Sequence, residues 1–156
     1  MSATPAIHAL RRHHVPFTEH TYRYEPHGGT RVSSRELAVS EHAVIKTLVM
    51  QDETGRPLIV LMHGDREVST KALARAIGVK TVEPCAPDVA EKHTGYLVGG
   101  TSPFGTRKTL PVYVERTVMD LEAVYVNGGR RGFLVRLAPR AFEQVLGATA
   151  VDAAIG

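Results

Sequence analysis

The sequence has one cysteine, no tryptophan and only 6% aromatic residues, and each scarcity narrows the structures available to it. A single thiol, Cys85, can form neither an internal disulfide nor a zinc cluster of several thiolates. The fold must therefore be held by its core alone. No apolar run approaches the roughly 18 residues needed to cross a bilayer. No basic segment followed by an apolar one opens the chain, so we expect a cytoplasmic protein without a membrane partner.

Length and composition predict one globular domain over residues 1–156. The chain is 43% hydrophobic and 22% charged, which is ordinary for a folded protein and excludes a disordered one. Its net charge is +3, from 19 basic and 16 acidic residues. Fourteen of the basic residues are Arg, which suits bidentate contacts with phosphate. This mild excess permits an anionic partner without requiring one.

Apolar periodicity and capping residues predict helices over residues 5–14, 33–39, 69–77, 87–93 and 139–146. Strands are expected over residues 15–24, 46–51, 57–63, 81–84, 110–118, 123–127 and 132–137, with a short apolar strand at 96–98. Ser33 or Ser34 is expected to open the second helix after an irregular stretch over residues 25–31. Several strands follow one another directly, which argues against a strictly alternating parallel sheet. We therefore predict an α+β fold, with a mixed or antiparallel sheet surrounded by helices.

Common catalytic signatures are missing from the sequence. There is no GxSxG, HExxH, P-loop or GxGxxG motif. No histidine is placed four residues from another beside a Glu or Cys, so no metal site is expected. Cys85 stands just before a predicted helix, which is one way to activate a thiolate, but the sequence shows no base paired with it. We expect Cys85 to be a small buried residue rather than a nucleophile.

Two segments carry features that a structural role alone does not require. Lys46 lies inside an apolar run over residues 44–50, and lysine is rarely fully buried without a partner. It either reaches solvent from the start of a strand or offers its ammonium to a carbonyl or phosphate at the floor of a pocket. Residues 95–105 form a loop rich in glycine and hydroxyl groups. Such a loop is either a wide turn or a place where a ligand approaches backbone N–H groups.

A third segment runs from Asn127 through Gly128 to Gly132. Asn-Gly is a strong signal for a tight hairpin, which accounts for the pattern without any ligand. The alternative is a polar side chain and flexible glycines beside a pocket, with Arg130 and Arg131 available to phosphates.

These segments, in this order and spacing, resemble the YbaK/EbsC family, free-standing relatives of the editing domain inserted in bacterial prolyl-tRNA synthetases. The resemblance spans nearly the whole chain and is most specific at residues 94–100, Ser102 and Pro103. It also includes residues 20–22, 46–47, 71–78 and 125–132. It is nearest to the YbaK branch, whose members hydrolyse Cys-tRNA(Pro).

The resemblance implies a trans-editing aminoacyl-tRNA deacylase that needs no cofactor. It cleaves the ester between a wrongly attached amino acid and the terminal adenosine of tRNA(Pro). The implied catalytic residues are Lys46, Gly99 and Gly100. The implied substrate-binding residues are Tyr22, Thr47, Thr101, Ser102, Pro103, Asn127, Gly128 and Gly129.

The resemblance also implies how the ester is cleaved. The substrate thiol would attack its own ester carbonyl, while backbone N–H groups around Gly99 and Gly100 polarise that carbonyl. Two positions depart from the YbaK pattern, since Asn127 stands in place of a serine and Leu134 in place of an aspartate. Sibling branches edit Ala-, Ser- or Thr-tRNA, so these substrates remain alternatives, as does a non-catalytic module that binds nucleotides or tRNA.

The expected partner is the acceptor end of a mischarged tRNA, and not DNA. Arg107, Lys108, Arg130 and Arg131 flank the two glycine-bearing segments, and we expect them to contact it with salt-sensitive affinity. Each of them could equally be a solvated surface residue. The sequence contains no separate tRNA-binding domain. Prolyl-tRNA synthetase is therefore an expected second partner that supplies recognition of the tRNA.

Overall fold

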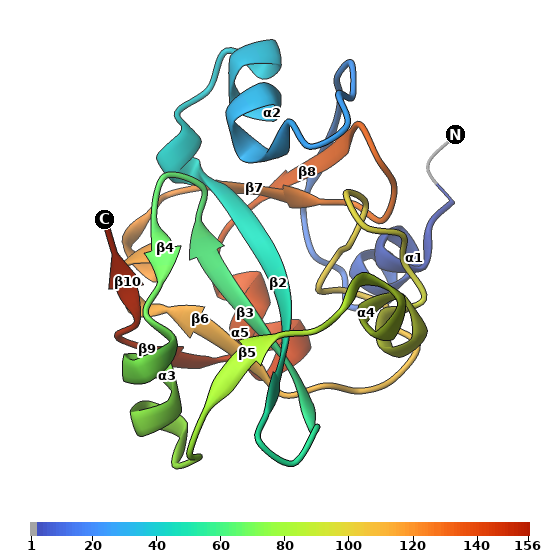
Figure 1. The fold of residues 1–156 in the computed structure, drawn as a ribbon. Coiled ribbons are helices and arrows are strands. Elements are labelled where there is room, and N and C mark those ends of the chain that lie inside the picture. The colour runs from blue at the N-terminus through green and yellow to red at the C-terminus, as the bar shows by residue number, and fades with distance from the viewer. Residues whose placement is uncertain (1–2) are drawn as a thin grey trace.

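A mixed sheet of eight strands organises the computed structural model, which describes residues 3–156 (Figure 1). Its strands are β1 (Thr18–Thr21), β2 (Val44–Asp52), β3 (Pro57–His63), β5 (Val82–Pro84), β6 (Val112–Glu115), β7 (Val124–Asn127), β8 (Phe133–Leu137) and β9 (Thr149–Val151). They lie in the order β1-β8-β7-β2-β3-β6-β9, and β5 also pairs with β2. A separate pair joins β4 (Glu67–Val68) to β10 (Ala154–Ile155).

The helices of the described chain are α1 (Pro5–Arg12), α2 (Gly29–Leu37), α3 (Thr70–Ile77), α4 (Pro87–Thr94) and α5 (Arg140–Leu146). Two 3₁₀ turns, η1 (Glu41–Ala43) and η2 (Arg116–Asp120), precede β2 and follow β6. Strand β2 runs parallel to β7, and β6 runs parallel to β3 and β9, whereas the other pairs are antiparallel. The predicted α+β class with a mixed sheet is confirmed.

Strands β2 and β3 separate two apolar cores, because successive side chains point to opposite faces of a sheet. Ile45, Ile59 and Leu61 belong to the larger core, to which α1, α5 and the strands β6 to β8 contribute. Met50 and Val60 belong to a smaller core that is covered by α3. The segment around β2 is therefore fixed from both faces.

Several predicted elements agree closely with the structure. Ser69 caps α3, with its hydroxyl accepting from Ala72 N, and Gly78 ends that helix in the left-handed conformation at φ 78°. The apolar runs at residues 46–51 and 57–63 form the antiparallel hairpin of β2 and β3. The hairpin expected after Asn127 joins β7 to β8.

Other elements correct the prediction. Helix α2 begins at Gly29 rather than at Ser33 or Ser34, whose hydroxyls lie in the helix interior and donate to the carbonyls of Thr30 and Arg31. The strand expected over residues 110–118 is shorter, because the Glu115 carboxylate accepts from Thr117 N and turns the chain into η2.

Residues 96–98 also differ from the prediction, since they form no strand and lead into a turn at residues 98–99. The short strands β4, β9 and β10 were not predicted. No helix within residues 3–156 has both the length and the apolar character to span a bilayer.

Candidate functional site

A cleft of about 690 Å³ opens beside β2, where that strand has no neighbour on one edge. The parallel pairing with β7 ends at Ile45, opposite Val126. The antiparallel pairing with β5 begins only at Met50, opposite Pro84. The backbone of residues 46–48 is therefore left without a strand partner on this edge, and these residues line the cleft.

Thr47 carries most of the unused polar groups at this edge. Val44 O accepts from Gly64 N, and Asp52 N donates to Arg56 O, so the even-numbered residues of β2 bond to β3. The alternation of an antiparallel pair directs the N–H and C=O of Thr47 the other way, toward the open edge. Its Oγ1 is also buried without a hydrogen-bond partner among residues 3–156. A buried polar group without a partner is unusual, and here it borders a cleft.

Lys46 is anchored at the start of β4. Its Nζ donates to Arg66 O at 2.5 Å and forms an ion pair with Glu67 Oε1 at 3.4 Å. The lysine side chain is only 19% exposed, although Glu67 is 79% exposed. An ammonium has three N–H donors, and these two contacts, to residues that do not line the cleft, leave one donor unused.

The two glycine-bearing segments are joined to each other at the mouth of the cleft. Asn127 Nδ2 donates to Gly99 O at 3.3 Å, and Asn127 Oδ1 accepts from Gly129 N at 2.7 Å. Arg131 Nε donates to Val98 O at 2.9 Å. Gly99 has a φ of 89°, and a Cβ built on it would lie 2.5 Å from the Tyr24 hydroxyl. Only glycine fits this position without strain.

Gly100 differs from the expectation that its N–H faces a substrate. That N–H donates to Leu97 O at 2.8 Å, and Gly100 does not line the cleft. A Cβ on Gly100 would lie 2.8 Å from the backbone of Arg130 and Arg131, so this glycine permits close packing of the two segments. Gly99 and Thr101 both line the cleft, and within the described residues their N–H groups have no partner. These two are the available donors.

The cleft brings together some of the predicted site residues and leaves out others. Those that line it are Tyr22, Lys46, Thr47, Gly99, Thr101, Asn127 and Arg131. Those that do not are Gly100, Ser102, Pro103, Arg107, Lys108, Gly128, Gly129 and Arg130. Ser102 is fully buried, and its hydroxyl accepts from Phe104 N at 3.2 Å, which is a structural contact.

Sequence reasoning missed part of the cleft wall. Tyr24 packs against Gly99, and Thr30, Val32 and Ser33 of α2 also line the cleft. The sequence pattern of these residues gives no sign of a binding site, and Thr30 and Val32 fall before the helix predicted over residues 33–39. Leu134, one of the two departures from the YbaK pattern, is buried and lines the cleft as well.

Tyr22 and Cys85 are the cleft-lining side chains with shifted pKa values. Burial raises the pKa of Tyr22, so its phenol is neutral at pH 7 and able to donate a hydrogen bond. Burial, together with the nearby Glu83, also raises the pKa of the Cys85 thiol. A neutral thiol is a poor nucleophile, so Cys85 is not an activated thiolate.

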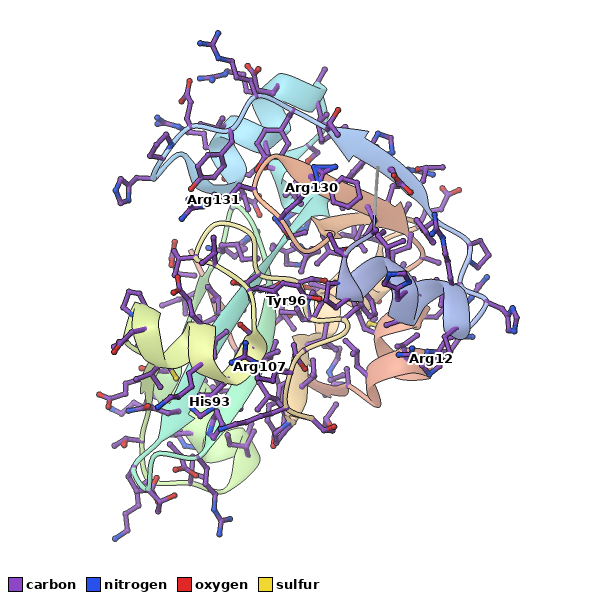
Figure 2. The ribbon with its side chains drawn as sticks, turned by 90° about the vertical axis from the view of Figure 1, so that its right-hand side faces the viewer. Arg12, His93, Tyr96, Arg107, Arg130 and Arg131 are labelled. Atoms are coloured by element: carbon purple, nitrogen blue, oxygen red, sulfur yellow. The ribbon has the colours of Figure 1, made fainter. Side chains whose placement is uncertain are left out.

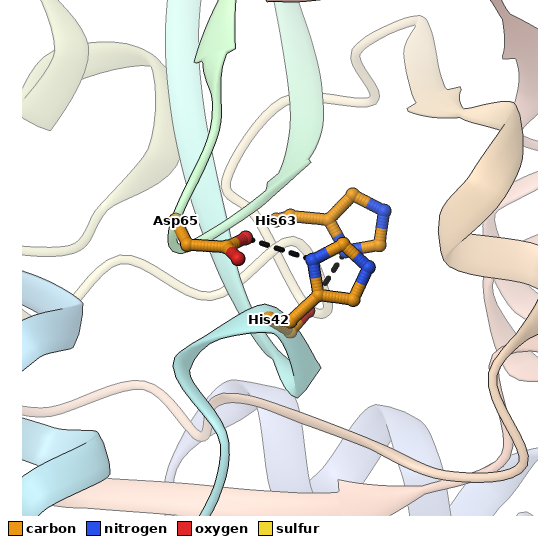
Figure 3. A group of neighbouring side chains, drawn as sticks. All are labelled: His42, His63 and Asp65. Carbon is orange, nitrogen blue, oxygen red and sulfur yellow. Dashed lines mark hydrogen bonds and ion pairs between the residues drawn. The ribbon is translucent and has the colours of Figure 1, made fainter. Parts of the chain in front are cut away.

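His42, His63 and Asp65 offer ligand atoms within 4.8 Å of one another, which suggests a metal site (Figure 3). The two imidazole rings are stacked, with centroids 3.7 Å apart and planes 8° from parallel. A ligated metal lies near the plane of each imidazole, and two stacked planes cannot share one ion. Both ring nitrogens of His63 are also occupied, at 2.8 Å from His42 O and from Thr117 Oγ1. The three residues fit a structural network better than a metal ion.

Cations gather in two places on the face that carries the glycine-bearing segments (Figure 2). In the hairpin after Asn127, the Arg130 guanidinium lies 4.4 Å from the Phe133 ring centroid, and that of Arg131, which lines the cleft, lies 5.4 Å from the Tyr24 centroid. At the end of α4, Arg107 donates to Lys92 O at 3.3 Å. We call the second group, Lys92, His93, Arg107 and Lys108, the α4-end cluster.

The charges of the α4-end cluster act on its histidine. Lys108 Nζ donates to His93 Nδ1 at 3.0 Å. Burial, followed by the charges of Lys108 and Lys92, lowers the pKa of His93. The histidine is therefore neutral at pH 7, and the cluster carries three positive charges.

A family model and individual relatives, compared with this chain, agree with each other. The model of a family described as an aminoacyl-tRNA editing domain matches residues 28–145. EbsC of Enterococcus faecalis, provisionally named a Cys-tRNA(Pro)/Cys-tRNA(Cys) deacylase, is 32% identical over 139 residues, which cover 88% of this chain and 85% of EbsC. The proline–tRNA ligase of Nitratidesulfovibrio vulgaris strain DP4 is 30% identical over 95 residues, covering 61% of this chain but only 16% of the ligase.

Two solved structures share the fold. The hypothetical protein APE2540 superposes with a TM-score of 0.88 at 23% identity, covering 97% of this chain and 99% of that protein. A second crystal structure is provisionally described as a trans-editing enzyme for prolyl tRNA synthetase. It superposes with a TM-score of 0.83 at 21% identity, covering 97% of this chain and 96% of the other.

Proposed function

Because the chain belongs to the aminoacyl-tRNA editing domain family, we propose that it is a trans-editing deacylase that cleaves the ester of a mischarged tRNA. Cys-tRNA(Pro) is the proposed substrate. The relative EbsC, whose name states deacylation of Cys-tRNA(Pro) and Cys-tRNA(Cys), supports this choice. So does the resemblance of residues 94–100 to the YbaK branch.

The observation that carries the proposal is the concentration of unused polar groups along one cleft. Thr47 presents its backbone and an unpartnered hydroxyl, and Gly99 and Thr101 have free N–H groups within the described chain. A volume of about 690 Å³ is in the range of small-ligand sites and suits an aminoacyl group with its terminal adenosine.

At this cleft the Cys85 thiol is not activated, and the Thr47 hydroxyl has no hydrogen-bonded base among the described residues, which favours assistance by the substrate. The cysteinyl thiol attacks its own ester carbonyl, so that a sulfur–carbon bond forms and the carbon–oxygen bond to the ribose breaks. The thiol proton passes to the departing ribose oxygen, and water later opens the cyclic thiolactone. The N–H groups of Gly99 and Thr101 stabilise the negative oxygen that develops on the carbonyl.

The remaining residues position the substrate. The free N–H of the Lys46 ammonium holds the ribose or phosphate of the terminal adenosine by a charge-assisted hydrogen bond. Tyr22, Thr47 and Asn127 orient the aminoacyl group, since small errors in geometry cost large factors in rate. A pocket distinguishes side chains that differ by one methylene by only about 1–3 kcal/mol. Discrimination among Cys, Ala and Ser therefore depends on the thiol as well as on fit.

Recognition of the acceptor end of the tRNA is assigned to basic residues in and beside the cleft. Arg107, Lys108 and Arg130 are exposed and, with Arg131, supply cations for phosphates of the acceptor end. Prolyl-tRNA synthetase is the proposed partner that selects tRNA(Pro).

The test is deacylation of Cys-, Ala-, Ser- and Pro-tRNA(Pro) by the wild-type protein and by Lys46→Ala. Cleavage of Cys-tRNA(Pro) alone, lost in the variant, is the expected result. Cleavage of Ala- or Ser-tRNA(Pro) instead would keep the deacylase and exclude the thiol-assisted step. No cleavage at any protein concentration would favour a module that only binds nucleotides or tRNA.

A further inference from the structure

Leu97 and Val98 stand side by side on the rim of the cleft with their side chains in solvent. They are 60% and 45% exposed, and Ile155 is the one other large apolar side chain exposed to this degree among residues 3–156. A single exposed apolar residue needs no explanation, but two neighbours at the mouth of a binding cleft mark a contact surface.

The loop beneath these side chains is held rigidly. Leu97 O accepts from Gly100 N and from Thr101 Oγ1, at 2.8 and 3.4 Å. Val98 N donates to Glu91 Oε2 at 3.1 Å, and Val98 O accepts from Arg131 Nε at 2.9 Å. The backbone is thus fixed by its own hydrogen bonds, and the two apolar side chains are presented without being needed to hold the loop.

Positive charge lies close to this rim. Arg131 Nε donates to Val98 O, and a Cβ built on Gly95, two residues before Leu97, would lie 3.5 Å from the Arg107 side chain. Figure 2 shows Arg130 and Arg131 on one side of Tyr96, and Arg107 and His93 on the other. Lys92, Arg107, Lys108, Arg130 and Arg131 form no ion pair within the described residues. The acidic residue that touches this loop, Glu91, is engaged by Val98 N.

Single-stranded RNA, in which phosphates alternate with flat apolar bases, is complementary to such a surface. Unpaired nucleotides expose their base faces, which pack on aromatic or guanidinium groups, and their phosphates meet neighbouring cations. Exposed aliphatic side chains such as Leu97 and Val98 offer the same base faces an apolar contact that removes both surfaces from water. A regular duplex hides its base faces and would leave Leu97 and Val98 in water. The surface is also continuous with the cleft, because Val98, Gly99 and Arg131 line both.

We propose that Leu97 and Val98 form a platform for the unpaired 3′-terminal bases of the tRNA. Arg131 and the α4-end cluster hold the phosphates on either side. The inference rests on the proposed function, because it assumes that the 3′-terminal adenosine enters the cleft. It adds that the protein recognises the single-stranded end rather than the paired stem.

The probe is a short single-stranded RNA that ends in CCA, compared with the same strand paired to its full length. Leu97→Ser is expected to weaken binding of the single strand by about tenfold, the size of effect expected when one large apolar side chain is lost from a contact. Ile155→Ser is the matched control, since it also removes an exposed apolar side chain, from β10. The fully paired RNA should bind weakly to all three proteins.

The dependence of RNA affinity on salt separates the apolar contribution of Leu97 and Val98 from the contribution of the cations. Leu97→Ser should leave the slope of log affinity against log salt unchanged, whereas Arg131→Gln should reduce it by about 0.7 for one lost phosphate contact. Loss of affinity through Leu97→Ser without a change in slope supports the platform. Equal binding of the single strand by Leu97→Ser and wild type would overturn it.

Deacylation of Cys-tRNA(Pro) distinguishes failure of this inference from failure of the proposed function. If wild type and Leu97→Ser cleave with the same KM, the deacylase stands and the platform is wrong. If neither cleaves but the single strand still binds through Leu97, the platform stands and the deacylase is wrong. Capture of prolyl-tRNA synthetase that depends on Leu97, with RNA binding unchanged, would assign the surface to a protein and overturn the proposal.

Discussion

Asn127 is bonded to Gly99 across the mouth of the cleft, with Nδ2 donating to the glycine carbonyl at 3.3 Å. The same side chain accepts from Gly129 N through Oδ1 at 2.7 Å. One amide thus links a loop that offers free N–H groups to the hairpin that carries Arg131. Proper spacing of the two segments therefore depends on this residue.

Asn127→Ala should loosen that link. Two hydrogen bonds are lost, and we expect the free energy of unfolding to fall by about 1 kcal/mol. The KM for Cys-tRNA(Pro) should rise because Gly99 and Arg131 are no longer held together. Urea unfolding and steady-state deacylation measure the two effects, and a variant with unchanged KM would show that the link does not position the substrate.

Gly99→Ala should abolish most of the activity by displacing Tyr24. Alanine at a φ of 89° is strained by about 1 kcal/mol, and its Cβ would meet the Tyr24 hydroxyl at 2.5 Å. Gly55→Ala is the matched control, since Gly55 has a φ of 83° and no atom within 4 Å of the added Cβ. Both variants share the backbone strain and should lose stability in urea, Gly99→Ala more because it also displaces Tyr24, but only Gly99→Ala should lose deacylation. Equal activities of the two variants would contradict this role for Gly99.

Cys85→Ala should retain deacylation within about twofold, although Cys85 lines the cleft. Burial and Glu83 raise the pKa of the thiol, so it is protonated and unreactive at pH 7. Iodoacetamide at pH 7 should therefore modify Cys85 slowly. Rapid modification with parallel loss of activity would instead make Cys85 a nucleophile.

Local signals predicted those parts of the fold that are determined by neighbouring residues. Ser69 and Gly78 mark the ends of α3 correctly, because capping and the left-handed conformation are properties of the local chain. The sequence predicts the start of α2 too late in the chain, because the glycines at 28 and 29 are typical of irregular segments. In the structure Val32 packs against Gly28, where a Cβ would lie 2.4 Å from Cγ2 of the valine. That contact forms only in the folded chain, so the sequence alone does not show where α2 begins.

Several residues of the site could be predicted from the sequence, but the arrangement of their backbone groups could not. Lys46, Thr47, Gly99 and Asn127 were all expected, and all four line one cleft. Which N–H groups are free could not be predicted, because the bond from Gly100 N to Leu97 O depends on the turn at residues 97–100. The open edge of β2 likewise arises from β5 and β7, which are distant in sequence.

Glu115 should make the free energy of unfolding depend on pH in the acid range. Burial alone would raise the pKa of this carboxyl, but hydrogen bonds from Thr117, Ala153 and Ala154 outweigh it and lower the pKa. A lowered pKa in the folded state stabilises the protein above the unfolded value of about 4.3, and this is lost as pH falls through the folded pKa.

Glu115→Gln tests that account. An amide cannot accept from all of these donors, so stability at pH 7 should fall by about 1–3 kcal/mol. The difference from wild type should shrink below pH 4, as measured by thermal unfolding from pH 3 to 7. Glu122→Gln, at an exposed position, should follow the wild-type curve. A difference that stays constant with pH would show that the Glu115 charge does not contribute.

Single-turnover cleavage of Cys-tRNA(Pro) by Lys46→Ala tests the central claim most directly. The matched control is Lys71→Ala, which removes an exposed lysine from α3. Loss of a charge-assisted hydrogen bond should slow Lys46→Ala by about 10- to 100-fold, with its unfolding temperature checked against wild type. Lys71→Ala should cleave at the wild-type rate. Equal rates for a folded Lys46→Ala and the wild type would contradict the proposed site.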